Sequence, residues 1–298
     1  MKIKQNFHIH SQRSCDSACA RILDIIAEME EFGIEEYGLT DHIHTAYNLP
    51  DVISARRDYL ASRPPANFHF GVEVSCMDQR ECDRVAAGDY TAWGDEPVYG
   101  FRDMTDYTGQ MAIGITPEEI LELGIEYVVG GVHWPLTVSE DRDAIIRNYL
   151  DQQLFLVRHP SVHVLAHPWD SLAHAVGNWY KYRTKEHVDL TAFRFIPEEY
   201  NDALAQALLE EGKAAEVNLA VVGGAIPEVR EYMLKLFAGW KQKGVKFTIG
   251  DDLHKAHFSK ELFERAEQWL TEWGFAENDF VLPFQQKLKQ YLPEQQTL

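Results

Sequence analysis

Pairs of histidines and carboxylates, separated by a single residue, stand near both ends of this sequence. The first pair is His8 and His10, at the end of an apolar run, and the second is Asp252 and His254. Because side chains alternate between the two faces of a β-strand, the members of each pair point the same way. Imidazole and carboxylate groups aimed at one point are suited to holding a metal ion.

The same residue types recur wherever a short apolar run ends. These further residues are His42, Glu73, His133 and His167. Imidazoles mixed with carboxylates favour Zn²⁺, Mn²⁺ or Fe²⁺, whereas Mg²⁺ and Ca²⁺ prefer ligands that are nearly all oxygen. A set of this size indicates two or three divalent ions. A single strand-end histidine is usually a hydrogen-bonded structural residue, so the metal hypothesis depends on this recurrence.

Residues so far apart in the sequence need a scaffold that gathers the ends of strands. Short apolar runs alternate here with amphipathic segments of helical length. Predicted strands cover residues 3–9, 37–39, 127–132, 162–166, 214–217 and 245–249, and predicted helices cover 18–32, 52–60, 143–157, 198–211 and 260–273. This alternation predicts βαβ units and a parallel sheet, open or closed into a barrel. Left-handed C-caps are expected at the glycines that follow helical segments, namely Gly33, Gly124, Gly212 and Gly244.

Two segments, 77–111 and 178–195, lack this alternation of apolar runs and amphipathic segments. They are predicted to be loop insertions. Loops at the carboxyl ends of barrel strands build active sites, so both are candidates for lids or substrate walls. Trp134 directly follows one candidate ligand and Trp169 stands two residues after another, and both are expected to line the pocket. We expect one domain over residues 1–298, with the barrel core at about 3–275 and a C-terminal extension at about 276–298.

Composition narrows the classes of partner. The 298 residues include 28 Lys and Arg against 47 Asp and Glu, a net charge of −19, which argues against a surface for nucleic acid. No apolar run approaches the roughly 18 residues that span a bilayer, so no membrane contact is expected. The four cysteines form no Cys-x-x-Cys pair. They are predicted to be reduced thiols of a cytoplasmic protein, with Cys15 and Cys19 packing on a helix.

Six short motifs, in their order along the chain, resemble those of the PHP (polymerase and histidinol phosphatase) family. They are His8-Ile9-His10, Thr40-Asp41-His42, Gly71-Val72-Glu73, Val132-His133, Ala166-His167-Pro168 and Asp252-Leu253-His254. The resemblance covers residues 3–254 and is strongest to the histidinol-phosphatase branch. It implies a distorted (β/α)7 barrel similar to a TIM barrel.

The resemblance also implies three metal positions. The implied ligands are His8, His10, Glu73 and Asp252 for the first ion, Glu73, His133 and His167 for the second, and Asp16, His42 and His254 for the third. Glu73 would bridge the first two ions. Asp251 does not match the motif, and it is expected to support the ligands indirectly or to cap a helix.

A phosphatase activity follows from the same resemblance. It implies that a metal-activated hydroxide hydrolyses a small phosphate monoester, such as histidinol phosphate, a nucleotide or a sugar phosphate. The candidate catalytic residues are His42, Asp252 and His254, and the leaving group would take its proton from His42, His254 or a water molecule. Candidate contacts to phosphate or substrate are Arg13, Lys181, Arg183, Glu216 and Asn218. After Asn218 the chain reads Leu219-Ala220, where many histidinol phosphatases have Thr-Ser-Gly, so the substrate stays open.

Other functions are compatible with the sequence. One is a phosphodiesterase or nuclease of the PHP type, and another is a PHP module that binds metal without turnover. A barrel amidohydrolase shares the His-x-His pair, but no strand end here supplies the lysine that such enzymes carboxylate. A homo-oligomer is also compatible. The other histidines are expected to be structural, or at most close to substrate: His44, His69, His159, His163, His174, His187 and His257.

Overall fold

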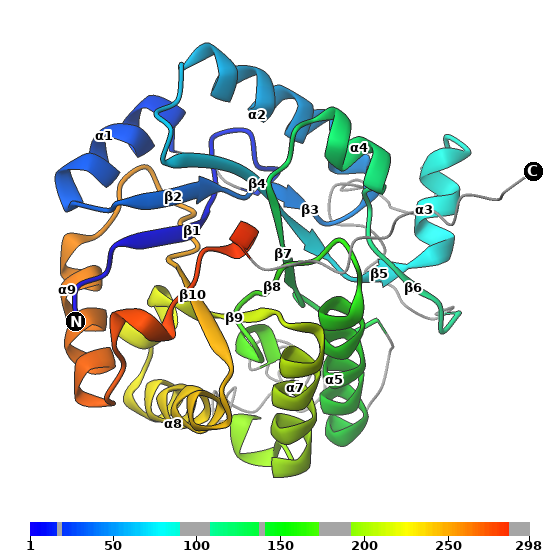
Figure 1. Cartoon of the computed structure of the whole chain (residues 1–298). Coiled ribbons are helices and arrows are strands. Elements are labelled where there is room, and N and C mark those ends of the chain that lie inside the picture. Colours follow the sequence, from blue (N-terminus) through cyan, green and yellow to red (C-terminus); the bar gives the residue numbers. More distant parts are fainter. Residues whose placement is uncertain (17–19, 90–107, 137–140, 173–191, 286–298) are drawn as a thin grey trace, which may run out of the picture.

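Seven parallel strands form a ring in the computed structural model, which describes residues 1–16, 20–89, 108–136, 141–172 and 192–285 (Figure 1). Around the ring they are β1 (Gln5–Ile9), β2 (Glu36–Leu39), β4 (Phe68–Ser75), β7 (Tyr127–Gly131), β8 (Val164–Leu165), β9 (Ala214–Asn218) and β10 (Lys246–Gly250). A short strand, β3 (His42–Ile43), also pairs with β4. The ring closes where the Asp252 amide donates to the His8 carbonyl at 2.9 Å. The predicted barrel of the distorted (β/α)7 type is confirmed.

Helices cover the outside of this ring (Figure 1). They are α1 (Ile22–Phe32), α2 (Leu49–Ala61), α4 (Pro117–Glu122), α5 (Arg142–Arg158), α7 (Glu198–Glu211), α8 (Pro227–Lys243) and α9 (Lys260–Glu272). The four predicted cap glycines all have positive φ, between 60° and 99°. The sequence prediction lacked α8, although Pro227 in its first turn and Gly244 at its C-cap are typical helix boundaries.

Of the segment 77–111 the structure describes residues 77–89 and 108–111, which lie outside the ring as predicted but are not loop throughout. Strands β5 (Met77–Asp78) and β6 (Met111–Ala112) pair antiparallel, and α3 (Gln79–Ala86) begins where the Asp78 carboxylate accepts from the Arg80 amide. Elements this short show no periodicity in a sequence. Of the second insertion, residues 192–195 form a 3-10 turn, and 178–191 lie outside the described residues.

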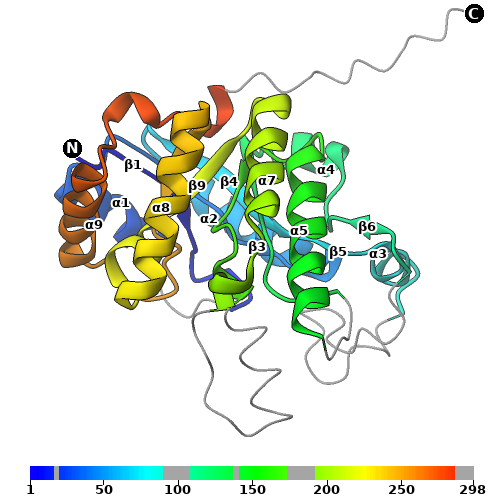
Figure 2. The same cartoon turned by 90° about the horizontal axis from the view of Figure 1, so that it is seen from below.

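The inside of the barrel contains an apolar layer, made of Phe7, Tyr127, Val129, Val164, Ala166 and Ala214. The Tyr127 side chain extends from β7 across the ring, and its hydroxyl donates to the backbone carbonyls of Phe7 and Leu39. A Cβ at Gly71 would lie 2.6 Å from the Tyr127 ring, so only glycine leaves room for this crossing. Val281, Leu282 and Phe284 pack against the apolar layer. The C-terminal segment thereby covers one end of the barrel (Figure 2).

Strand β1 contains one extra residue. Asn6 pairs with Tyr37 and Ile9 pairs with Leu39, so three steps along β1 match two steps along β2. Such a bulge re-aims the side chains beside it. It allows Phe7 to join the apolar layer while the next residue, His8, faces the carboxylates of Glu73 and Glu216. Separately, none of the helices in the described part of the chain is long and apolar enough to cross a membrane.

Candidate metal centre

The carboxylate of Glu73 is the centre of a cluster of imidazoles. Residues 71, 73 and 75 of β4 share the inward face of the strand, and Glu73 is fully buried. Five histidine nitrogens lie within 3.5 Å of its oxygens: His8 Nε2 at 2.9 Å, His42 Nδ1 at 2.9 Å, His10 Nε2 at 3.5 Å, His167 Nε2 at 2.9 Å and His133 Nε2 at 3.2 Å. These residues come from strands or strand ends all around the ring, so the barrel gathers the predicted ligands as the sequence suggested.

Asp252 adds a second carboxylate beside the first. Its Oδ1 lies 3.1 Å from His10 Nε2 and 3.5 Å from His8 Nε2. Asn218 Nδ2 lies 3.3 Å from the other oxygen of Asp252. Both Asp252 and His167 have positive φ, 54° and 26°, a backbone conformation that non-glycine residues rarely adopt. Strain of this kind persists only where the surroundings enforce it, and it is common at functional sites.

Asp16 forms a third group with His42 and His254. Its Oδ2 lies 3.0 Å from His42 Nε2 and 3.2 Å from His254 Nε2, and the two imidazole nitrogens are 3.3 Å apart. The three residues come from the segments that follow β1, β2 and β10. With about a third of its side chain exposed, His254 is the most open of these imidazoles. This group therefore lies nearest to the mouth of the barrel.

Two glycines leave the space that the buried carboxylates occupy. A Cβ at Gly131 would lie 2.3 Å from Glu73 Oε1, and a Cβ at Gly250 would lie 2.1 Å from Glu216 Oε1. Both distances are far shorter than ordinary contacts between such atoms. Strands β7 and β10 therefore need glycine at these points for the carboxylates to reach the inside of the barrel.

The hydrogen-bond pattern of these side chains fits divalent cations. His8 Nδ1 lies 2.7 Å from Glu216 Oε1, while its Nε2 faces Glu73. A neutral imidazole carries one ring proton, so one of these two contacts has no hydrogen unless the ring is protonated. Burial lowers the pKa of His8, but Glu216 and Glu73 outweigh it and raise the pKa well above its ordinary value, so a second proton or a cation completes the pair of contacts. His254 has the same mismatch, because its Nδ1 donates to the Asp252 carbonyl at 2.9 Å and its Nε2 then presents a lone pair to Asp16. A cation between lone pair and carboxylate removes both mismatches, and a histidine ligand usually has such an outward hydrogen bond.

The pKa values of the cluster residues are also compatible with bound cations. Burial lowers the pKa of the His10 imidazole to about 3, so it is neutral at pH 7. Burial also lowers the pKa of His42, but Glu73 and Asp16 outweigh it and the net pKa rises to about 10. Burial raises the pKa of Glu73, but the neighbouring imidazoles reverse this and hold it well below its ordinary value. Carboxylates that stay ionised and keep protons on the neighbouring imidazoles can hold metal ions in the same places, and metal ions bind in competition with those protons.

The candidate substrate contacts that the structure describes already have partners within the protein. Glu216 is buried, and it accepts from His8 Nδ1 and from the His167 backbone amide at 2.7 Å, a position that favours holding these histidines over contacting substrate. Asn218 Oδ1 accepts from the Ala220 amide at 2.9 Å. Arg13 is half exposed and pairs with Asp58 at 2.7 Å.

Asp251 is buried and accepts from Asn6 Nδ2 at 3.0 Å, so it supports strand β1 and caps no helix. Trp134 packs beside His44 and His133, as a pocket wall would. Trp169 instead lies in the hydrophobic core, where its indole donates to Asn201 at 3.0 Å. Five residues named in the sequence analysis lie outside the described residues: Cys19, His174, Lys181, Arg183 and His187.

Sequence reasoning missed two residues of the cluster, His44 and Ser75. His44 is buried, its ring stacks on that of His42 with centroids 4.0 Å apart, and its Nδ1 lies 2.8 Å from Ser75 Oγ. Ser75 Oγ lies at the same distance from His133 Nδ1. The signal was available, because His42 and His44 are separated by one residue just as His8 and His10 are. By contrast, His69, His163 and His257 are hydrogen-bonded away from the cluster.

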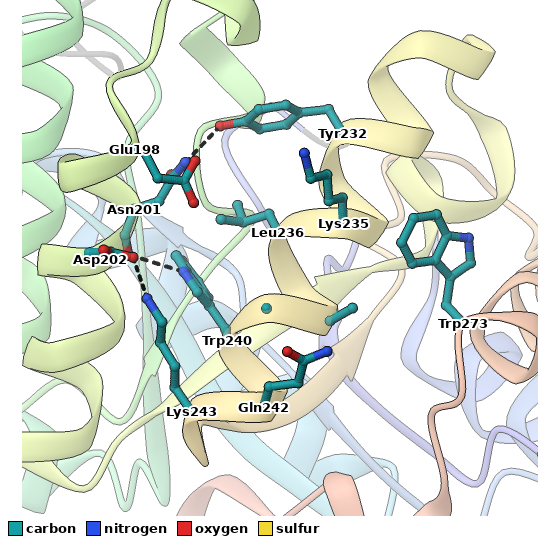
Figure 3. Close-up of a pocket in the computed structure, with 12 residues that line it drawn as sticks. Glu198, Asn201, Asp202, Tyr232, Lys235, Leu236, Trp240, Gln242, Lys243 and Trp273 are labelled. Carbon is teal, nitrogen blue, oxygen red and sulfur yellow. Dashed lines mark hydrogen bonds and ion pairs between the residues drawn. The ribbon is translucent and has the colours of Figure 1, made fainter.

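A separate hollow of 360 Å³ lies on the outside of the barrel, between α7 and α8 (Figure 3). Asn201 donates to the Tyr232 hydroxyl at 3.1 Å, and the Trp240 indole donates to the Asn201 carbonyl at 3.0 Å. Lys243 pairs with Asp202. None of the cluster residues lines this hollow, and Asn201, Tyr232 and Trp240 already bond to one another.

Comparison of the chain with models of protein families identifies one family. A family model described as the PHP domain matches residues 6–273. Among solved structures, the chain is similar to histidinol phosphate phosphatase (HISK) from Lactococcus lactis subsp. lactis Il1403, solved with zinc, L-histidinol and phosphate, at 19% identity over 93% of this chain and 95% of that chain, with a TM-score of 0.60. It is also similar to hisK from Listeria monocytogenes, an inferred histidinol phosphatase, at 12% identity over 85% of this chain and 96% of that chain, with a TM-score of 0.53.

At these identities the likeness to solved structures concerns the fold. Comparison with curated proteins gives no match. The match to the family model extends over most of the sequence and includes every strand of the ring. The chain therefore belongs to the PHP domain family.

Proposed function

We propose that this protein is a metal-dependent phosphoesterase that hydrolyses a small phosphate monoester. The observation that carries the proposal is the position of Glu73, whose two carboxylate oxygens face separate groups of imidazoles. Oε2 faces His8 and His10, whereas Oε1 faces His133 and His167. A carboxylate in this position is suited to bridge two cations, as sites for two-metal hydrolysis require.

The proposed ligand sets follow these groupings. They are His8, His10, Glu73 and Asp252 for the first ion, Glu73, His133 and His167 for the second, and Asp16, His42 and His254 for the third. Donor sets of imidazole and carboxylate favour zinc, manganese or iron. Such ions lower the pKa of water towards neutrality and neutralise charge on a phosphoryl group.

The side chains around the ligands have defined parts in this proposal. Glu216 accepts from His8 Nδ1, which directs the His8 Nε2 lone pair at the first position. His254 lies at the open edge of the cluster, with Nδ1 bonded to the Asp252 carbonyl. If no cation occupies the Asp16 position, a proton on His254 Nε2 is available to the leaving alkoxide. If a cation is bound there, His254 is a ligand and the proton comes from water.

Histidinol phosphate is the first substrate to test. The fold is similar to that of histidinol phosphatases. The net charge of −19 disfavours a polyanion such as nucleic acid and is compatible with a small phosphate that is neutralised inside the cluster. Nucleoside monophosphates and sugar phosphates are the other monoesters in the panel.

The test combines metal analysis with assays of phosphate release. Purified protein is expected to contain zinc, manganese or iron, to lose activity on dialysis against a chelator, and to regain it when one of these metals is added back. Monoesters are expected to be cleaved much faster than bis(p-nitrophenyl) phosphate or single-stranded DNA, and faster cleavage of either diester would favour the nuclease alternative.

A pair of variants sharpens this test. His10→Ala is expected to lose metal and activity, because His10 Nε2 faces both Asp252 and Glu73. His163→Ala is the matched control, since that buried imidazole accepts from the Val128 amide outside the cluster. Full metal content together with full activity in His10→Ala would show that the proposed site is wrong.

A further inference from the structure

His44 lies beside the proposed third metal position, although the resemblance to PHP motifs gives it no part. It directly follows β3, two residues after His42, so both imidazoles are on the same face of the strand. Its Nε2 lies 3.7 Å from Asp16 Oδ2. One carboxylate oxygen is therefore surrounded by three imidazole nitrogens, those of His42, His254 and His44, at 3.0, 3.2 and 3.7 Å.

These separations are those of ligands around one small cation. Zinc binds imidazole nitrogen and carboxylate oxygen at about 2.0 to 2.2 Å in a tetrahedron, which places neighbouring ligand atoms roughly 3.3 to 3.5 Å apart. The distance between His42 Nε2 and His254 Nε2 is 3.3 Å, and those from Asp16 Oδ2 to the three nitrogens bracket the same value. Four of the six distances in such a set are therefore close to those of a tetrahedral site, which takes four donors.

Ser75 supplies the outward hydrogen bond that a histidine ligand needs. A hydroxyl oxygen has two lone pairs, and both His44 Nδ1 and His133 Nδ1 lie 2.8 Å from Ser75 Oγ. If both imidazoles donate from Nδ1, both Nε2 atoms present lone pairs to the inside of the cluster. His133 Nε2 then faces Glu73, and His44 Nε2 faces Asp16. Ser75 is itself buried on the inward face of β4.

We propose that His44 is the fourth protein ligand of the ion at Asp16, His42 and His254, and that Ser75 orients this ligand together with His133, a ligand of the second ion. This inference rests on the proposed function, because it presupposes that the cluster binds metal. Four protein donors close the site, so the third ion has no open position for water or substrate. Its part is then to hold the mouth of the barrel and to add positive charge next to the two-metal pair.

The number of bound zinc ions tests whether His44 is a ligand. Zinc titrations against a competing chelating dye are expected to find three sites in the wild-type protein. His44→Ala is expected to weaken the third site by about 100-fold or more, beyond the 10- to 100-fold typical for residues that only support a ligand. His254→Ala marks the same site as a positive control. His69→Gln is the matched control with three sites, because His69 bonds to Glu36 and Glu126, away from the cluster.

Cobalt provides a readout that does not depend on activity. The visible absorption of Co²⁺ is strong in four-coordinate sites and weak when water raises the coordination number, so the absorption of the third Co²⁺ is expected to fall in His44→Ala. Ser75→Ala is expected to weaken the second and third sites by about 10- to 100-fold each. A merely structural part for Ser75 would lower the unfolding temperature and leave both affinities unchanged.

The outcomes separate the two proposals. If His44→Ala keeps three sites of wild-type affinity while His254→Ala loses one, His44 is not a ligand and the proposed function stands. A wild-type protein with only two zinc sites also overturns the ligand assignment. If the wild-type protein binds no zinc, manganese or iron, the proposed function is wrong and the inference fails with it. If His44→Ala does not fold, the zinc sites are counted in His44→Gln instead, because glutamine keeps most of the side-chain volume.

Discussion

The inside of the barrel has two layers of opposite character, and the same strands build both. Strand β7 gives Tyr127 and Val129 to the apolar layer, and its next inward positions are Gly131 and His133. Strand β9 likewise gives Ala214 to the apolar layer and then Glu216 to the cluster. The position of a residue along its strand therefore determines whether its side chain packs in the apolar layer or joins the cluster. Each step of two residues keeps the side chain inside the barrel and moves it towards the mouth.

The two layers also differ in what they contribute to stability. The apolar layer removes hydrocarbon surface from water, which favours the folded state. The cluster layer buries carboxylates, and its backbone is strained at His167 and Asp252, so attraction to imidazoles or cations has to offset these costs. We therefore expect substitutions in the cluster layer to change activity far more than stability, and those in the apolar layer to do the reverse.

The largest effect is expected for Glu73→Gln. Removing the carboxylate that faces five imidazoles should lower kcat/KM by at least about 1,000-fold, equivalent to about 4 kcal/mol of transition-state stabilisation. In the presence of chelator the free energy of unfolding should fall by less than this, because the desolvation cost of the buried carboxylate partly offsets its attraction to the imidazoles. Phosphatase assays and urea unfolding measure the two quantities, and a large loss of stability without loss of activity would break the contrast between the layers.

Phe284→Ala is the opposite test. This ring packs against the apolar layer, 5.9 Å from the Phe7 ring, and its truncation should lower the free energy of unfolding by about 2 kcal/mol or more. Zinc content and kcat/KM of the folded protein should stay at wild-type values. Loss of metal in folded Phe284→Ala would mean that the two layers are not separate.

A smaller effect is expected from the pH dependence of His69, which also borders the apolar layer. Burial lowers its pKa, but Glu126 and Glu36 outweigh burial, so the pKa in the folded protein is raised above the ordinary value near 6.5. The stabilisation is then complete below pH 6.5 and is lost as the pH rises through the raised value. Relative to His69→Gln, the wild type should be more stable at pH 6 than at pH 9 in urea unfolding, and a constant difference would contradict this.

The smallest effect is expected for Arg13→Ala. Its guanidinium pairs with Asp58 at the surface, and exposed pairs contribute little to stability. KM for the phosphate ester and the unfolding midpoint should both remain close to wild type. A marked rise in KM would instead support the phosphate contact that the sequence suggested.

The sequence could predict which histidines and carboxylates lie together, because alternation along strands is local. A pair such as His8 and His10 shows its common direction in the sequence alone. The same rule applies to His44, which lies two residues after His42 but matches no motif. The bulge in β1 is not visible in the sequence, because one extra residue changes which side chains face inward without changing composition.

Residues that act through burial and partners were harder to predict. Glu216 was a candidate substrate contact, and only the fold shows that it lies behind His8. Arg13 is close to the His8 and His10 pair in sequence, yet its partner Asp58 is on α2. Contacts of this kind depend on which elements meet in space, and the spacing of residues along a chain does not encode that.

The ring closes through its first and last strands, where the His8 carbonyl accepts from the Asp252 amide. Ribosomes release the N-terminal strand long before the last one, so a nascent chain carries the early histidines without the aspartate that completes their basin. If the cluster binds metal as proposed, the first ion would be loaded late in biosynthesis, because Asp252 is the last of its four ligands to be synthesised. A chain that ends before Asp252 would lack a complete first position, although it contains the residues of the second.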